Sequence, residues 1–393
     1  MKNLVFAFAL LCSTSLVAQF SYHVDENGVL GTGIQSPTNT ASGVYSIAMG
    51  SSAQANGGYS TVIGTQSVAT DIGSIAIGGG VNSDGLYSVG LGSSIAASGD
   101  YSMAMGYETQ ASGYSSTAMG NGTTANGDYS TAMGIGTQAS GDYSTTMGNE
   151  TIASGNTSTA MGNNTTASGS TSTALGYQTN ASGNQSIAIG WRTNSNGAVS
   201  TAIGAATNAE DYISFAIGTY NKTDETPNPD SFSFENTAFV IGNGGFNSNG
   251  DFIGTDESRS NAFEVLFDGT TTIAGDLNIN SDVRLKANII SLGATLSKLL
   301  QIDGKTYTMK KDANHKKKIG VLAQDIEKVF PELVTETNDI KSVNYQGLVP
   351  VLINAMKEQQ DEIERLKKQE AKLNKQQQEI NELKAMVKQF MSK

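Results

Sequence analysis

The sequence has little of what most catalytic and metal-binding proteins use. Its 393 residues include one cysteine, two histidines, one tryptophan and five prolines. The single cysteine, Cys12, lies in the first 18 residues, so the chain after them has no thiol for disulfides or thiol chemistry. His23 and His315 stand in no metal-ligand or triad pattern. We therefore predict no metal and no cofactor.

Basic residues are scarce in the first 280 positions, which hold 4 Lys and Arg against 21 Asp and Glu, a net of about −17. Residues 281–393 hold 20 against 15, a net of about +5. This division marks a domain boundary. Lys and Glu interleave in the basic part, which is typical of a solvated helix surface rather than of a nucleic-acid-binding face. No nucleic-acid partner is predicted.

Long apolar runs are also missing. Residues 1–18 have the pattern of a secretory signal peptide, with Lys2 before the apolar stretch Leu4 to Leu11 and small residues near Ala18. That stretch is too short to span a membrane, and no later segment is apolar enough to be a transmembrane segment. The sequence predicts an exported protein, either at the cell surface or secreted.

What the chain does contain is a repeat of 14 residues without insertion. Each repeat begins with a serine and has a glycine four residues later. An uninterrupted period of this length predicts a solenoid, in which each repeat is one coil. A coil of 14 residues has room for two short strands and two turns but not for a helix. The thirteen serines are Ser46, Ser60, Ser74, Ser88, Ser102, Ser116, Ser130, Ser144, Ser158, Ser172, Ser186, Ser200 and Ser214.

Side chains alternate within the repeat, as in a strand with two different faces. Counting the serine as zero, position two is nearly always alanine and position three is always large and aliphatic. We expect the aliphatic row to fill the solenoid core, which requires fewer assumptions than metal or cofactor binding by its methionines, and the narrow alanine face to pack against a copy of the chain. The position-three residues are Met49, Ile63, Ile77, Leu91, Met105, Met119, Met133, Met147, Met161, Leu175, Ile189, Ile203 and Ile217.

Threonines form a second row at position seven. A flat threonine array is what an ice-binding solenoid displays, although β-branched residues also suit strands in general. Both interpretations stay open from the sequence. The row consists of Thr109, Thr123, Thr137, Thr151, Thr165, Thr179, Thr193 and Thr207.

The unit Ser46-Ile47-Ala48-Met49-Gly50, followed by Ala55 and Gly57, resembles the head repeats of trimeric autotransporter adhesins. The resemblance covers residues from about 31 to 218. It implies a left-handed parallel β-roll, a homotrimer with a fibrous shape, and adhesion to an unknown surface ligand.

The domain organisation follows from these changes in pattern. We expect a lead-in at 19–45, the β-roll at 46–218, a β-rich neck at 219–280, a small α+β domain at 281–352 and a coiled-coil helix at 353–393. The fold class is mostly β. In the neck, Gly242–Asp251 has some likeness to a calcium-binding loop, but a single copy is more typical of a turn.

Residues that could carry chemistry begin at position 281. A serine hydroxyl becomes a nucleophile when a base takes its proton, and a desolvated lysine can be that base. Ser281 and Lys286 are five residues apart, so bringing them together requires a loop or bend rather than a regular helix. A simpler interpretation makes Ser281 and Asp282 an N-cap for a helix that begins near Val283.

The segment from Ser281 to about Gln359 resembles the intramolecular chaperone domain of phage tailspike endosialidases, peptidase family S74. The resemblance rests on the motif around Ser281, on Tyr307, on Ile319–Val334 and on Lys341–Tyr345. It implies three copies that guide trimerisation and then cut themselves off between Asn280 and Ser281, with Ser281 as nucleophile and Lys286 as general base. Residues that would shape the site are Asp282, Arg284, Asn288, Gln324 and Asp325.

Two alternatives to this self-cleaving fibre remain. A purely structural adhesin would have the same tail but would never cut. An ice-binding or carbohydrate-binding rod would act through the threonine row.

Overall fold

The computed structural model describes residues 21–24, 30–35, 38–223, 226–310 and 315–392, with side chains from residue 38 onward. The predicted signal peptide and Cys12 lie outside the described residues. The chain divides into two units, the first ending at Leu277 and the second beginning at Asn278. We describe each unit by itself.

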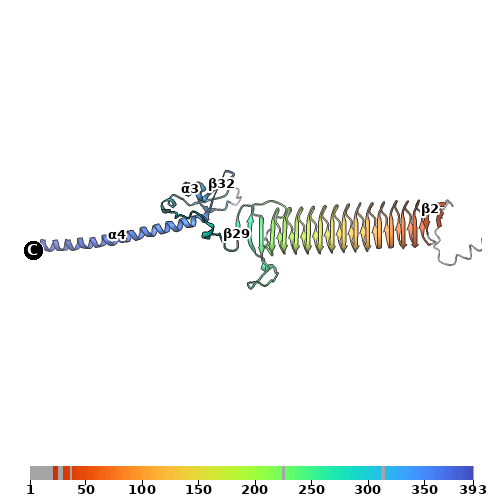
Figure 1. Ribbon diagram of the computed structural model, residues 1–393, viewed down its shortest axis with the longest axis horizontal. Coiled ribbons are helices and arrows are strands. Elements are labelled where there is room, and N and C mark those ends of the chain that lie inside the picture. The colour runs from red at the N-terminus through yellow and green to blue at the C-terminus, as the bar shows by residue number, and fades with distance from the viewer. Residues whose placement is uncertain (1–20, 25–29, 36–37, 224–225, 311–314, 393) are drawn as a thin grey trace, which may run out of the picture. The chain divides into compact units, whose positions relative to one another are not determined.

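The first unit is a stack of thin coils, most of them with a long strand and a short strand (Figure 1). In β8 and β9 the two strands of the coil are continuous. Two strands, β1 (Ser21–Val24) and β2 (Leu30–Gln35), precede the stack. The long strands are β4 (Ile47–Ser51), β6 (Thr61–Thr65), β8 (Ile75–Ser83), β9 (Val89–Ala97), β10 (Met103–Tyr107), β12 (Thr117–Asn121), β14 (Thr131–Ile135), β16 (Thr145–Asn149), β18 (Thr159–Asn163), β20 (Thr173–Tyr177), β22 (Ile187–Trp191), β24 (Thr201–Ala205) and β26 (Phe215–Thr219). The short strands are β3 (Thr40–Ala41), β5 (Gln54–Ala55), β7 (Val68–Ala69), β11 (Gln110–Ala111), β13 (Thr124–Ala125), β15 (Gln138–Ala139), β17 (Ile152–Ala153), β19 (Thr166–Ala167), β21 (Asn180–Ala181), β23 (Asn194–Ser195) and β25 (Asn208–Ala209).

Every coil pairs with the next in parallel and in register. Met119 lies beside Met133 and Gly120 beside Gly134, a step of 14 residues that holds from β4 to β26. A parallel β-solenoid with two strands per coil is therefore confirmed.

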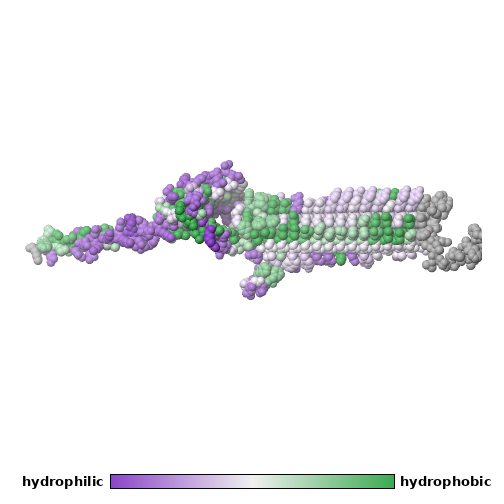
Figure 2. All heavy atoms as spheres, in the orientation of Figure 1, coloured by the Kyte–Doolittle hydropathy of each residue, from purple (hydrophilic) through white to green (hydrophobic). Residues whose placement is uncertain are grey.

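The prediction that the position-three aliphatic residues fill the solenoid core, with the alanine face against another copy, was wrong. The alanines at position two point inward and are fully buried, as Ala118 and Ala132 illustrate. None of the position-three side chains is buried, and Met147 is 41% exposed. The reason is the short coil, whose two strands lie so close that only small side chains and, in three coils, the β-branched Val62, Val81 and Ile95 fit between them. The aliphatic residues instead form a row on the outside of the long strands, and Figure 2 shows hydrophobic residues as a band along this unit.

The threonine row at position seven also points inward. Thr137 and Thr151 are 0% exposed, and their hydroxyls have no hydrogen-bond partner among the described residues. A buried row contacts neither ice nor a saccharide, so the interpretation of the rod as an ice-binding or carbohydrate-binding surface through these threonines is wrong.

The neck continues the stack before ending it. Strand β27 (Thr237–Asn243) pairs in parallel with β26, but Ile217 lies beside Ile241, a step of 24 residues rather than 14. Strands β28 (Asn261–Leu266) and β29 (Thr271–Ile273) then add in antiparallel orientation. A short helix, η1 (Asp256–Ser258), precedes β28. The predicted β-rich neck is thus present.

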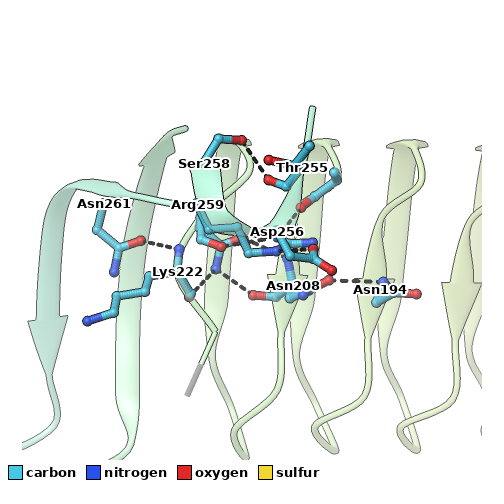
Figure 3. A network of polar contacts seen from close by, with 10 residues as sticks. Asn194, Asn208, Lys222, Thr255, Asp256, Ser258, Arg259 and Asn261 are labelled. Atoms are coloured by element: carbon cyan, nitrogen blue, oxygen red, sulfur yellow. Dashed lines mark hydrogen bonds and ion pairs between the residues drawn. The ribbon is translucent and has the colours of Figure 1, made fainter. Parts of the chain in front are cut away.

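The side of the stack that is formed by the short strands ends at a group of polar side chains, among them Arg259, which we call the polar cap (Figure 3). In earlier coils the backbone N–H at position eight donates to the backbone of the next coil. In the last coil the side chain of Asn221 takes that place, since its Oδ1 accepts from the N–H of Asn208 at 2.7 Å and its Nδ2 donates to the carbonyl of Asn208 at 2.9 Å. The guanidinium of Arg259 donates to the carbonyls of Ala206 and Asn221. Side chains thereby replace the missing coil.

The second unit contains a small α+β domain and one long helix. The domain core consists of Ile326, Val329, Phe330 and Val351. The helix α4 (Leu348–Met391) has 44 residues, and its apolar residues beyond Gln359 are all exposed in the single chain. The other elements are η2 (Val283–Leu285), α2 (Leu296–Leu299), β30 (Lys305–Tyr307), β31 (Lys318–Gly320), α3 (Ala323–Val329), η3 (Pro331–Leu333), β32 (Val334–Thr337), β33 (Ile340–Val343) and η4 (Tyr345–Gly347).

Candidate active site

One turn of 3-10 helix, η2, organises the start of the second unit. Asp282 is its N-cap, because the side chain accepts from the N–H of Arg284 at 2.9 Å. The N–H of Leu285 then bonds to the carbonyl of Asp282, and the chain leaves the turn extended at Lys286. The predicted N-cap is therefore confirmed for Asp282.

The same turn brings Ser281 and Lys286 together. The Nζ of Lys286 lies 2.6 Å from the Oγ of Ser281. A single 3-10 turn flanked by extended residues provides the bend that the five-residue spacing requires. The contact between Ser281 and Lys286 and the N-cap at Asp282 are present in the same turn. The nucleophile–base interpretation and the N-cap interpretation of this segment therefore do not exclude each other.

Asp282 is held by Arg284 rather than by the lysine. The Arg284 Nε and Nη2 donate to the two carboxylate oxygens at 3.0 and 2.7 Å. The hydrogen bond from the Arg284 side chain, followed by the bond from its backbone, lowers the pKa of Asp282, and the pKa of Arg284 is raised in return. Asp282 therefore stays ionised at neutral pH and fixes the shape of the turn.

Apolar side chains surround the pair in sequence and are open to solvent in the single chain. Val283, Leu285 and Ile289 are 67%, 70% and 62% exposed, and Ile290 is 86% exposed. Isolated exposed aliphatic residues are normal on proteins, but several within eight positions indicate a surface that binds another surface.

The remaining predicted site residues lie apart from this contact. Asn288 is exposed and has a left-handed backbone, with φ of 52°. Gln324 is exposed on α3, and Asp325 pairs with Lys328 at 2.9 Å, which lowers the pKa of Asp325. Across the described part of the unit, no hydrogen bond or ion pair joins these residues to Ser281. Their proposed part in the site stays a prediction.

A contact that the sequence did not reveal ties the long helix to this domain. Glu358, in α4, accepts from the backbone N–H groups of Thr295 and Leu296 at 2.5 and 3.2 Å. It thereby caps α2 from 63 residues away, and these bonds lower the pKa of its carboxyl. Thr295 is itself buried and donates to the carbonyl of Val351.

Other candidate groups form no comparable arrangement. In the glycine loop of the neck, the Oδ1 of Asn247 accepts from the N–H groups of Asn249 and Asp251, as in an Asx turn. Within the described ranges no three His, Cys, Asp or Glu side chains converge on one point. Nor do these ranges contain a helix long and apolar enough to cross a membrane.

Comparison with known families matches two segments of the chain. Residues 281–335 match the chaperone of endosialidase. The YadA head domain repeat, in two-copy units, matches residues 41–65, 55–80, 97–123, 125–151, 139–165, 153–177 and 167–193.

The chain is also similar to long tail fibre proteins of bacteriophages. It is 34% identical to long tail fiber protein Gp37 of Salmonella phage S16 over 128 residues, which are 30% of this chain and 16% of that protein. It is 33% identical to the protein of the same name from Enterobacteria phage M1 over 119 residues, 27% of this chain and 47% of that protein. The chain thus spans less than half the length of these curated relatives. Both resemblances found in the sequence are confirmed, and the chain joins repeats of the YadA head type to a domain of the endosialidase chaperone type.

Proposed function

We propose that this chain is an exported, homotrimeric, adhesin-like fibre whose second unit guides trimerisation and then cuts itself off between Asn280 and Ser281. The observation that carries the cleavage step is the 2.6 Å contact between Lys286 Nζ and Ser281 Oγ. The matched families and the fibrous relatives support the fibre.

The exposed aliphatic row of the long strands supports assembly. The large side chain at position three is half-buried or exposed in every coil, whereas the buried positions hold small or β-branched residues. Packing three such rows together would remove from water the apolar surface that the single coil leaves open. The apolar residues of α4 beyond Gln359 would pair in the same assembly as a coiled coil.

Assembly would also activate the serine. A lysine in water keeps its proton and cannot act as a base, whereas removal of water favours the neutral amine. When other copies cover Val283, Leu285 and Ile290, Lys286 would lose water and accept the hydroxyl proton of Ser281. Cleavage would then follow trimerisation rather than precede it.

The bond changes are those of an acyl shift followed by hydrolysis. Ser281 Oγ attacks the carbonyl carbon of Asn280, and the proton passes through Lys286 to the departing nitrogen of Ser281. The peptide C–N bond breaks and an ester forms. Water then hydrolyses the ester, which leaves a carboxylate on Asn280 and a free amine and hydroxyl on Ser281.

The test is expression of residues 19–393 followed by mass measurement of the products. We expect a fragment of 113 residues from Ser281 to Lys393. Ser281→Ala and Lys286→Ala should leave the chain intact, while Ser297→Ala, at an exposed serine of α2, should cleave normally. A wild-type trimer that stays whole contradicts the cleavage step and favours the non-cutting structural adhesin.

A further inference from the structure

A column of exposed tyrosines runs along one corner of the rod. Five successive coils each contribute one ring, and the ring centroids of neighbours are 5.0 to 5.8 Å apart. Each side chain is between 41% and 57% exposed. The members of this tyrosine column are Tyr87, Tyr101, Tyr114, Tyr129 and Tyr143.

The fold does not require tyrosine at this corner. The corner residue has a positive φ in every coil, from Tyr87 at 54° to Thr157 at 57°, and later coils carry threonine, glutamine or valine there. A bulky residue in this backbone region is uncommon. Where the corner residue is Ser115, the residue before it, Tyr114, supplies the ring and the column continues. The rings are therefore maintained for a reason other than the turn itself.

The charge around the column is of one sign. Asp100, Asp128 and Asp142 are exposed at the same corner. Each accepts from a backbone N–H group of the preceding coil, those of Leu86, Tyr114 and Asp128 respectively. These bonds hold the carboxylates in place. Between positions 3 and 191 the sequence has no lysine or arginine. A polyanion would therefore be repelled here, and a cationic or neutral ligand would not.

The tyrosine hydroxyls are hydrogen-bond donors at neutral pH. For Tyr129, burial beside its neighbours, followed by the charges of Tyr114, Tyr143 and Asp128, raises the pKa above its ordinary value. The column thus offers ring surface, hydroxyl donors and carboxylate acceptors at each coil. A ligand that uses all three has flat apolar faces, hydroxyls and positive charges repeated along its length.

We propose that the tyrosine column binds an extended polysaccharide that carries amino groups. Neighbouring rings stack on one another or meet edge to face, so the column presents ring edges and hydroxyls to the solvent, and the C–H groups and hydroxyls of the sugar contact these. Its ammonium groups lie beside the exposed carboxylates of Asp100, Asp128 and Asp142. A β-linked sugar chain repeats at nearly the spacing of the coils, so successive sugars meet successive tyrosines. This inference names the ligand class of the proposed adhesin-like fibre, and so rests on the proposal that the rod serves attachment.

The test is a calorimetric titration of the full chain with a glucosamine hexasaccharide at low salt. We expect binding that weakens as salt is added, because exposed charges are screened. The triple variant Tyr101→Thr, Tyr114→Asn, Tyr129→Thr places residues that occur at the same repeat positions elsewhere, as in Asn156 and Thr157. It should bind at least about tenfold more weakly, since each ring contact contributes a factor of roughly two to ten. Tyr177→Thr, at an exposed tyrosine of β20 away from this corner, is the matched control and should bind normally.

A gain of binding gives an independent result. Thr157 occupies the corner one coil beyond Tyr143, so Thr157→Tyr should extend the column and strengthen binding severalfold. The fully N-acetylated hexasaccharide should bind more weakly than the free amine. Absence of binding, equal binding of the N-acetylated sugar, or an equal loss in Tyr177→Thr would overturn the proposal. Oligomeric state and cleavage, measured on the same samples, report separately on the fibre: a triple variant that fails to assemble would identify the column as a contact between copies instead.

Discussion

The corner glycines predict a large difference between two substitutions only two residues apart. Gly134 has φ of 126°, and a Cβ added there would lie 1.9 Å from the carbonyl oxygen of Gly148 in the next coil. Gly136 has φ of 62°, and the nearest atom to an added Cβ is 3.7 Å away, in the flexible side chain of Glu150. Both glycines have a positive φ, but only at Gly134 would an added side chain collide with backbone atoms of the next coil.

The magnitudes follow from that geometry. For Gly134→Ala, the backbone strain costs about 1 to 3 kcal/mol. The two coils must also separate, which breaks bonds such as the one from the N–H of Glu150 to the carbonyl of Ile135, at about 1 kcal/mol each. We expect a loss of about 3 to 5 kcal/mol. For Gly136→Asn the expected change is below about 0.5 kcal/mol, because Asn164 already occupies the equivalent corner two coils later.

The assay is denaturant unfolding of each full-length variant, monitored by the circular dichroism signal of its β-strands. Gly134→Ala should lower the midpoint strongly and increase protease sensitivity, while Gly136→Asn should match the wild type. Equal effects of the two substitutions would refute the close backbone approach as the reason for glycine at this corner.

Three further predictions concern the core, the site and the long helix. Thr137→Val should raise the free energy of unfolding by up to about 1 kcal/mol, because it removes a buried hydroxyl without a partner among the described residues. Ala132→Leu, larger than any side chain buried at position two, where Val62 and Thr146 also fit, should lower it. Ile290→Asp should slow cleavage at least about tenfold by keeping water at Lys286, whereas Ile340→Asp, at another exposed isoleucine on β33, should not. Equal rates of cleavage in the two variants would count against solvent exclusion. The lowered pKa of Glu358 means that its stabilising contribution is complete above its ordinary value of 4.5 and is lost as pH falls through the lower folded value, so Glu358→Gln should flatten the acid side of the stability curve.

The 14-residue period was sufficient to predict the stack, since any slip would break the pairing of Met119 with Met133 along the whole rod. It could not tell which face lies inside. The alternation of side chains indicates that Ala118 and Met119 face opposite ways. Which of the two lies inside depends on the distance between the two strands of a coil, and the sequence pattern of one coil does not contain that distance. Large side chains were therefore assigned inward, where only small ones fit.

At the candidate site, local spacing was enough to require a bend between Ser281 and Lys286, because the contact lies within six residues. The cap of Asn221 and Arg259 and the bond of Glu358 to Thr295 were not predictable in this way. Asn221 stands at position seven of the last coil, but its side-chain bonds to Asn208 depend on where the stack ends. The bonds of Arg259 to Asn221 and of Glu358 to Thr295 join residues 38 and 63 positions apart.

The direction of the backbone hydrogen bonds has a mechanical consequence. They join each coil to the next, so a pull along the rod loads them coil by coil rather than all at once. Releasing one coil frees 14 residues, nearly 50 Å of extended chain from about 4.8 Å of rod. A rod under tension would therefore lengthen roughly tenfold in steps before any covalent bond is stressed, and would act as a shock absorber between its two ends.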